Sequence, residues 1–196
     1  MSIQNLEKYL PDNTLPYLKN WFSEYYIHIK ITRDRHSKLG DYRKLTDRSH
    51  EITINSTLAP QLFFFVLTHE LAHLIAFEKY GRRISPHGAE WKDTFRKMLL
   101  ESLEVYEQDL RPIITRFSRS PKANFMSSPE LVRYFHIGKE GDDLQFMEEL
   151  KKGDSFIYRD EKYLLEGLIK KNYLCRNLVT GRQYSFKPLA RVKKCS

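Results

Sequence analysis

The sequence predicts an α+β fold in which a small antiparallel sheet packs on helices and a small all-β module follows. Three observations support this fold class. The runs 26–31 and 51–55 alternate polar and apolar side chains, as strands with one buried face do. The run Gln61–Phe77 is apolar on nearly every side, which is typical of a buried helix. After Gly153 the apolar period shifts to two, and turn residues separate several short runs.

The first 60 residues contain two predicted helices followed by three predicted strands. The helices cover residues 3–9 and 15–25, and the second has Thr14 as its N-cap and Pro16 in its first turn. The strands, with a turn at 38–41 after the first, are predicted at residues 26–31, 41–45 and 51–55. Short connections between consecutive strands predict a small meander packed on the helices.

The next two predicted helices flank a turn. The apolar helix 61–77 should end near Gly81, because glycine suits the C-terminal cap of a helix. Ser85-Pro86-His87-Gly88 is a predicted turn, and helical periodicity resumes over Ala89–Leu103. His87 therefore starts a segment that can fold back over the apolar helix, and Gly88 lets the backbone pass close to it.

The middle of the chain is a predicted helical connector in which we identify no residues suited to chemistry. Glu104–Phe117 has helical periodicity with a proline at 112, Ser118–Ser128 has the composition of a loop, and Ser128-Pro129-Glu130 signals a further helix. The predicted domain ranges are therefore 1–105, 106–150 and 151–196.

The C-terminal module is predicted to be a small antiparallel sheet, either SH3-like or simply rolled. Its strand candidates are residues 155–158, 162–165, 173–178, 183–186 and 191–192. Residues 151–196 contain 12 Lys+Arg and 4 Asp+Glu, whereas residues 1–150 contain 21 of each. The whole net charge of +8 thus lies in this module, where it attracts phosphate backbones or acidic surfaces. A basic segment that serves only solubility is the alternative.

The composition argues against several classes of protein. The N-terminal segment lacks a basic start followed by an apolar core, so no signal peptide is predicted. The longest apolar run is interrupted by His69, Glu70 and His73, so no membrane span is predicted. Cys175 and Cys195 are fewer cysteines than a secreted disulfide scaffold uses. We therefore expect a cytoplasmic protein without a membrane partner.

The motif His69-Glu70-Leu71-Ala72-His73 lies within the apolar helix and carries the clearest chemistry of the chain. Two imidazoles four residues apart on a helix point to nearly the same side. Catalytic zinc takes three protein ligands and leaves one position open for water, and His87 is the candidate third ligand. Glu70 lies next to the first ligand, where it can act on that water as a general base. The expected cofactor is one Zn²⁺ ion.

A chance motif, or a purely structural pair of histidines, is the alternative explanation. In a chain with seven His and fifteen Glu, an accidental HExxH is expected in roughly two cases in a hundred. The apolar surroundings favour the metal site, because buried His and Glu side chains are costly unless they coordinate an ion or are hydrogen-bonded. For His87 the alternative is an ordinary helix-capping turn.

These residues and their surroundings resemble the SprT-like metalloprotease family, whose members include the Spartan-type proteases. The family pattern is a strand ending in an Ile-x-Ile/Leu-Asn step, an apolar helix with HExxH, a His-Gly pair and then an aromatic residue. The resemblance covers roughly residues 15–105, about half the chain, and the matching residues are Ile52-Thr53-Ile54-Asn55, His69–His73, His87-Gly88 and Trp91.

The resemblance implies a zincin-like domain that acts as a zinc metalloprotease. By the same resemblance, Glu70 is the catalytic acid/base and the zinc ligands are His69, His73 and His87. The implied substrates are proteins, which in the Spartan-type branch include proteins bound or crosslinked to DNA. Many family members carry a C-terminal zinc ribbon with two CxxC pairs. Because this chain has no CxxC, a second, structural zinc is not expected, and a DNA role borrowed from the family is weakened.

The leading prediction is therefore a zinc-dependent peptidase in which Glu70 takes a proton from water and passes it to the leaving amine. A further donor should stabilise the oxyanion. The sequence leaves three candidates for it, namely Tyr80, His50 and the Arg82-Arg83 pair.

A second prediction, from a different class, is a nucleic-acid-binding protein whose metal site is structural or inactive. Basic residues of the C-terminal module are interleaved with Tyr173, Tyr184 and Phe186, which could stack on bases. The alternative for these rings is the core of the small sheet. The peptidase and the nucleic-acid-binding predictions are compatible if the basic module brings a protease to DNA-bound proteins. A metallohydrolase that acts on a substrate other than a peptide is the third possibility.

Overall fold

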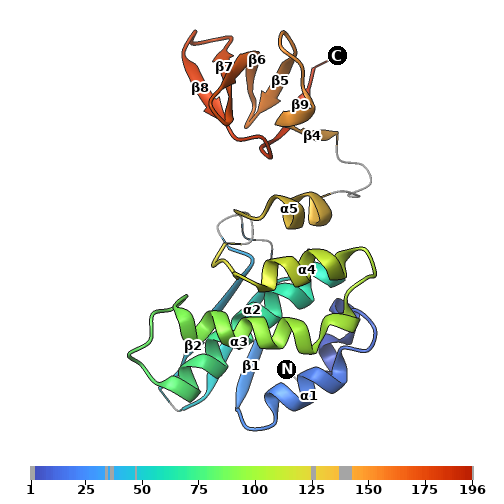
Figure 1. Ribbon diagram of the computed structural model, residues 1–196, viewed down its shortest axis with the longest axis vertical. Helices are drawn as coiled ribbons and strands as arrows, with labels where there is room; N and C mark the ends of the chain where they lie inside the picture. Colours follow the sequence, from blue (N-terminus) through green and yellow to red (C-terminus); the bar gives the residue numbers. More distant parts are fainter. Residues whose placement is uncertain are drawn as a thin grey trace. The chain divides into compact units, whose positions relative to one another are not determined.

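The computed structural model describes residues 3–33, 35, 38–46, 48–124, 127–136 and 143–195 (Figure 1). The chain divides into two compact units, Met1–Phe135 and His136–Ser196. Residues 125, 126 and 137–142, which belong to the predicted loop and connector, lie outside the described residues. The three domain ranges expected from the sequence stay predictions.

The first unit combines helices with one three-stranded sheet over its described residues. In chain order, with η for a 3-10 helix, its elements are η1 (Ile3–Tyr9), α1 (Leu15–Phe22), β1 (Ile27–Thr32), β2 (Gly40–Lys44), β3 (His50–Asn55), α2 (Pro60–Tyr80), α3 (Ala89–Glu101), η2 (Leu103–Val105), α4 (Leu110–Ser118) and α5 (Pro129–His136). The α+β class is confirmed, and so are the predicted helices and strands of residues 1–103, within a few residues at their ends.

The predicted helix 104–117 is corrected, because η2 and α4 are separate elements there. Pro112 lies in the first turn of α4 and not in a helix interior. In that position its missing N–H removes no helical hydrogen bond, so the proline marks where a helix begins.

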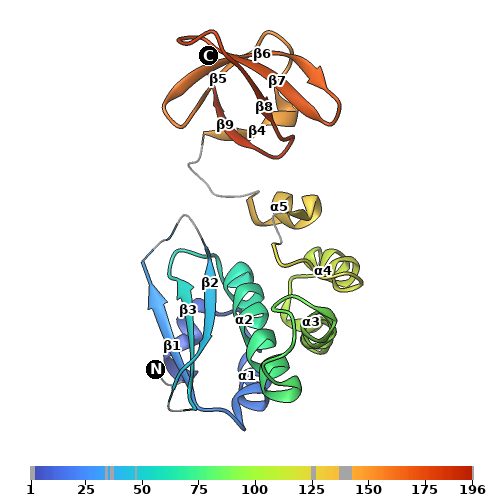
Figure 2. The ribbon, with the colours of Figure 1, turned by 90° about the vertical axis from the view of Figure 1, so that its left-hand side faces the viewer.

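The sheet has the order β1-β3-β2, which corrects the predicted antiparallel meander in one respect (Figure 2). β2 and β3 are antiparallel, but β1 runs parallel to β3, with Ile29 opposite Ile52. Burial explains the order. All residues of β3 except Thr53 are buried, whereas β2 has no fully buried residue. The most buried strand takes the centre and the more polar β2 takes an edge.

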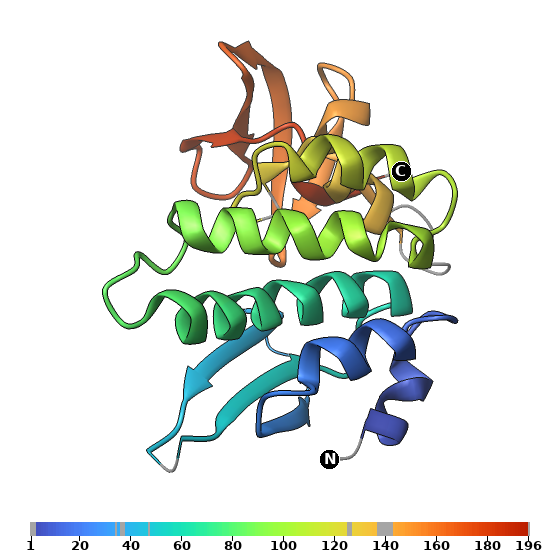
Figure 3. The same ribbon diagram turned by 60° about the horizontal axis from the view of Figure 1, so that its bottom comes forward.

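Helix α2 lies between the sheet and α3 and forms the centre of the core (Figures 2 and 3). Three consecutive, fully buried phenylalanines point to different neighbours. Phe63 stacks on Tyr9 of η1, and Phe64 stacks on Trp21 of α1. Phe65 contacts rings of α3, α4 and α5, at centroid distances of 5.5 to 5.9 Å. Packing on every side explains why the α2 sequence is apolar all round.

By length and composition alone, α2 could also cross a membrane. However, 67% of its most apolar window is buried inside the unit, as in the core helix of a globular domain.

The second unit is an antiparallel sheet of six strands over its described residues. In chain order its elements are β4 (Leu144–Phe146), η4 (Met147–Glu149), β5 (Ser155–Tyr158), β6 (Glu161–Ile169), β7 (Asn172–Asn177), β8 (Gln183–Phe186) and β9 (Arg191–Lys194). The sheet order is β4-β9-β5-β6-β7-β8. All five predicted strands are confirmed. The additional strand, β4, has three residues, too few to show an alternating pattern.

This sheet is rolled, because strands that are not neighbours share one core. The rings of Phe156 on β5 and Phe186 on β8 are 5.2 Å apart, although β6 and β7 lie between these strands in the sheet order. The buried core of the roll consists of Met147, Leu150, Phe156, Tyr163, Leu165, Cys175, Phe186 and Val192.

Candidate metal centre

The second half of α2 places His69, Glu70 and His73 in the interior of the first unit. The two histidines are half-buried, and the exposed fraction of Glu70 is only 7%. Apolar residues surround them along the helix, and the spacing of four residues places His69 and His73 on nearly the same side of α2.

The connection between α2 and α3 brings His87 back to this side. At Gly81, which ends α2, φ is 80°, a conformation that side chains rarely adopt, and its N–H donates to the Phe77 carbonyl at 2.8 Å. The chain then turns at Ser85–Gly88, where the Gly88 N–H donates to the Ser85 carbonyl at 2.9 Å. Gly88 is the N-cap of α3, so His87 lies directly before that helix.

The structure brings the three predicted ligands together, with one potential ligand atom from each within 4.8 Å of the others. His73 is central, because its Nε2 lies 3.2 Å from Nε2 of His69 and 3.1 Å from Nε2 of His87. Two nitrogen ligands of a tetrahedral zinc ion, each about 2.0–2.1 Å from the ion, are about 3.3 Å apart. The donor set therefore fits a zinc ion.

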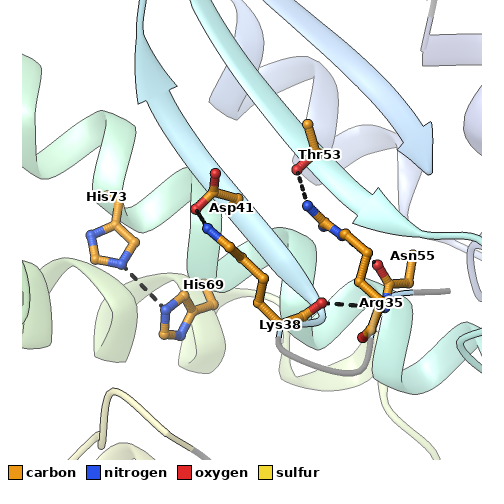
Figure 4. A network of polar contacts seen from close by, with 7 residues as sticks. All are labelled: Arg35, Lys38, Asp41, Thr53, Asn55, His69 and His73. Carbon is orange, nitrogen blue, oxygen red and sulfur yellow. Dashed lines mark hydrogen bonds and ion pairs between the residues drawn. The ribbon is translucent and has the colours of Figure 1, made fainter. Parts of the chain in front are cut away.

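The protonation state of the cluster also fits a metal. Burial, together with a smaller effect of the neighbouring histidines, lowers the pKa of His69 to about 3 and the pKa of His73 to about 4. Burial lowers the pKa of His87 as well. The three imidazoles are thus neutral near pH 7, which is the form that binds a metal ion. Figure 4 shows the facing rings of His69 and His73.

Trp91 of α3 packs against all three histidines. Its ring centroid lies 4.8 Å from that of His69, 5.2 Å from that of His73 and 4.7 Å from that of His87. Trp91 is fully buried, and its position one turn after His87 explains why the sequence pattern has an aromatic residue there.

Glu70 lies beside the histidine cluster and under the first residues of β2. Burial raises the pKa of Glu70 to about 8, with a further contribution from Asp41, whereas Lys38 and Arg35 act in the opposite direction. The backbone N–H of Tyr42 donates a hydrogen bond to its carboxylate. A carboxyl group held in this way is suited to accept and return a proton near neutral pH.

Asn55, the last residue of β3, holds the segment that leads into β2 (Figure 4). Its Nδ2 donates to the carbonyls of Arg35, at 3.1 Å, and Lys38, at 3.3 Å, while its Oδ1 accepts from Arg35 Nε at 2.9 Å. Lys38 in turn pairs with Asp41 at 2.8 Å. The Asn of the Ile-Thr-Ile-Asn step therefore positions the charged residues that surround Glu70.

The candidate oxyanion donors lie at different depths. His50 is buried on β3 and hydrogen-bonded to Tyr42, at 3.1 Å. Tyr80 is the last residue of α2, with an exposed fraction of 41%, and Arg82 and Arg83 are exposed in the connection that follows. The assignment of this role stays a prediction.

The sequence reasoning missed Gly40 and Tyr42, which approach the site from β2. The geometry of a strand could have indicated that they belong together, because alternate residues such as Gly40, Tyr42 and Lys44 lie on one face of it. What the sequence does not contain is the identity of the element that this face contacts.

We expect Gly40→Ala to destabilise the protein and to impair the site. A Cβ added at Gly40 would lie 2.7 Å from Val66 Cγ1 and 2.8 Å from Glu70 Oε1. Either β2 or Glu70 must then shift, and such overpacking costs about 1–3 kcal/mol. Urea unfolding measures the loss of stability. An unchanged free energy of unfolding would contradict the close approach of β2 to α2.

Known proteins match parts of the chain. A protein-family model described as the SprT-like family matches residues 13–108. Three curated relatives, each named Protein SprT, align with parts of the chain. The one from Pseudomonas fluorescens (strain SBW25) is 36% identical over 61 residues, which cover 30% of this chain and 37% of the relative. The one from Glaesserella parasuis serovar 5 (strain SH0165) is 42% identical over 41 residues, which cover 21% and 26%.

The third relative, from Actinobacillus succinogenes (strain ATCC 55618), is 42% identical over 43 residues, which cover 22% of this chain and 25% of the relative. The alignments thus span between a quarter and somewhat more than a third of the relatives' own length. No solved structure matches the chain significantly.

Proposed function

Since residues 13–108 belong to the SprT-like family, we propose that the chain is a zinc-dependent metallopeptidase. The observation that carries this proposal is the convergence of His69, His73 and His87 through their Nε2 atoms beside the buried carboxyl of Glu70. The three histidines would hold the ion. When bound there, zinc polarises the scissile carbonyl and makes the attacking water more acidic.

The protein residues supply the proton transfers of the reaction. Glu70 accepts the proton of the attacking water and delivers it to the leaving amine. The Tyr42 N–H keeps the Glu70 carboxylate directed at the site, and Trp91 excludes water from one side of the imidazole cluster.

A peptide substrate is supported by the position of β2. It is an edge strand of the described sheet and reaches Glu70 through its backbone. Extended peptides bind edge strands by adding a further strand to the sheet. The proposed substrates are therefore proteins with unfolded or extended segments.

The direct test is metal analysis of the purified chain together with cleavage of casein or histones, with and without DNA. We expect about one zinc per chain and hydrolysis that stops when a chelator removes the metal. A zinc-free protein that takes up no added zinc would overturn the proposal. The free cysteines, Cys175 and Cys195, fit the reducing cytoplasm that we propose as its compartment.

A second function, binding to nucleic acid, is favoured by a group of lysines in the second unit. We call it the lysine cluster, and it consists of Lys151, Lys152, Lys170, Lys171 and Lys187. Each of the five is exposed, and none forms an ion pair with another described residue of the chain. By contrast, Arg176, Lys193 and Lys194 are neutralised by Glu166, Asp143 and Asp154.

Strand pairing gathers three members of the lysine cluster, Lys170, Lys171 and Lys187, at one end of the rolled sheet. Lys170 and Lys171 form the turn between β6 and β7, and Lys187 follows Phe186, which pairs with Tyr173 just after that turn. Lys152 acts electrostatically on Glu166 of β6. Concentrated unpaired charge of this kind binds phosphates without regard to base sequence.

The predicted base-stacking role of the aromatic residues has less support. Phe186 belongs to the buried core of the roll, and Tyr173 packs against that core. Tyr184 contacts Tyr163 and keeps an exposed fraction of 40%. The proposed contact is therefore made through lysines and phosphates, with at most one stacking ring.

We expect alanine at Lys170, Lys171 and Lys187 to weaken DNA binding and to flatten its salt dependence. Each lost phosphate contact lowers the slope of log K against log salt by about 0.9. Fluorescence anisotropy with a labelled duplex at several salt concentrations measures this slope. Alanine at Lys8, Lys19 and Lys97, which removes the same charge from the first unit, is the control and should leave the slope unchanged. Equal slopes for the two triple variants would reject the lysine cluster as the binding surface.

A further inference from the structure

Alternate residues of β2 follow α2 turn by turn. Gly40 lies against Val66 and Glu70, and the ring of Tyr42 lies parallel to that of His73. Lys44 pairs with Glu78 at 2.6 Å. One face of an edge strand is thus in register with the part of α2 that carries the general base and two ligands.

Tyr42 contacts this machinery in two ways. Its backbone N–H donates to the Glu70 carboxylate, while its ring lies parallel to the His73 imidazole, with an interplanar angle of 1° and centroids 6.3 Å apart. The Trp91 ring is also nearly parallel to His73, at 26° and 5.2 Å. Trp91 belongs to α3 and Tyr42 to β2, two elements that lie on either side of α2 (Figure 2). The His73 ring is therefore held by aromatic rings from two different elements.

The Tyr42 ring is itself held by a polar contact at its hydroxyl group. Its hydroxyl lies 3.1 Å from Nδ1 of His50, a residue that is 2% exposed. Nε2 of His50 lies 3.2 Å from Nζ of Lys44, which also binds Glu78. An ammonium group can only donate, so Nε2 of His50 accepts, and the proton on Nδ1 is donated to the Tyr42 oxygen. In the series Tyr42–His50–Lys44–Glu78, each hydrogen bond then joins one donor to one acceptor.

We infer that Tyr42 is a positioning residue of the metal centre, fixed by His50 and acting on His73 through its ring. This inference rests on the proposed metal site. A ligand imidazole that is free to rotate must be ordered when the ion binds, whereas a ring held in place in advance makes binding tighter and its geometry unique. Neither Tyr42 nor His50 needs to touch the ion or the substrate for this effect.

The test compares Tyr42→Leu with Tyr42→Phe in the full chain. Leucine removes the parallel ring and should weaken zinc binding by about 10- to 100-fold, as loss of an outer-shell partner does. Phenylalanine keeps the ring and loses only the contact with His50, so it should restore most of the affinity. Zinc affinity is measured by competition with a chromophoric chelator, and the visible absorption spectrum of the Co²⁺-loaded protein reports the ligand geometry. The spectrum should change in Tyr42→Leu and return towards wild type in Tyr42→Phe.

Tyr26→Leu is the matched control, because Tyr26 is 72% exposed. It should leave both the affinity and the Co²⁺ spectrum unchanged. His50→Gln provides a second variant that keeps the Tyr42 ring but alters its support, and it should weaken zinc binding less than Tyr42→Leu does. If Tyr42→Leu binds zinc as wild type does, with an unchanged Co²⁺ spectrum, Tyr42 is not a positioning residue. A wild-type chain that binds no metal would instead overturn the proposed function itself.

Discussion

Replacement of Glu70 by Gln should abolish peptide hydrolysis while the zinc content stays at the wild-type level. Glutamine has the shape of glutamate but cannot accept the proton of the attacking water, and loss of a general base typically lowers a rate by about 10²- to 10⁴-fold. Glu70 is not one of the three residues whose nitrogen atoms converge, so the metal should remain bound. The stability should also be kept, because the change removes a carboxyl group that burial already disfavours in its ionised form.

The experiment pairs a peptidase assay with metal analysis of the same preparation. Glu7→Gln makes the same chemical change at an exposed position of η1 and should retain full activity. Wild-type turnover by Glu70→Gln would show that another group moves the proton. Loss of both zinc and activity would assign Glu70 to metal binding and not to proton transfer.

Replacement of His87 by Ala should remove most of the bound zinc without unfolding the domain. With one of three protein ligands gone, zinc affinity should fall by a factor on the order of 100 or more. His87 is the best position for this test, because it lies in the connection before α3, whereas His69 and His73 are part of the core helix. Its removal should disturb the packing of α2 little.

Metal content after purification and zinc affinity by chelator competition measure the effect. His28→Ala removes an imidazole from β1 and should leave zinc binding unchanged. Circular dichroism establishes that both variants are folded. An unchanged metal content in His87→Ala would remove His87 from the site and leave the two helical histidines as a structural pair.

Local patterns in the sequence were sufficient to predict most of the helices and strands and the residues of the candidate site. The i, i+4 spacing of His69 and His73 on a helix, and the turn that returns His87, depend only on the neighbouring residues. Strand alternation likewise identified five strands of the second unit, because each has one buried and one exposed face. β4 was too short for such a pattern.

The order of the strands in the first sheet could not be predicted from such local patterns. A hairpin connects β2 and β3, but nothing local in the sequence shows that β1 pairs with the other edge of β3, and in parallel. Pairing between distant strands depends on which of them can be buried on both sides, and this follows from the packing of α2 against the sheet. The antiparallel meander failed for this reason.

By itself, then, the sequence determined the α+β class, the buried helix and the three histidines with their neighbouring carboxyl, because helix spacing and apolar periodicity are properties of contiguous residues. Only the tertiary structure decided that the edge strand β2 lies over this helix, with Gly40 against Glu70 and Tyr42 parallel to His73. The physical reason is that such contacts join segments about 30 residues apart along the chain, and their register is selected by the packing of the whole core and not by any local preference.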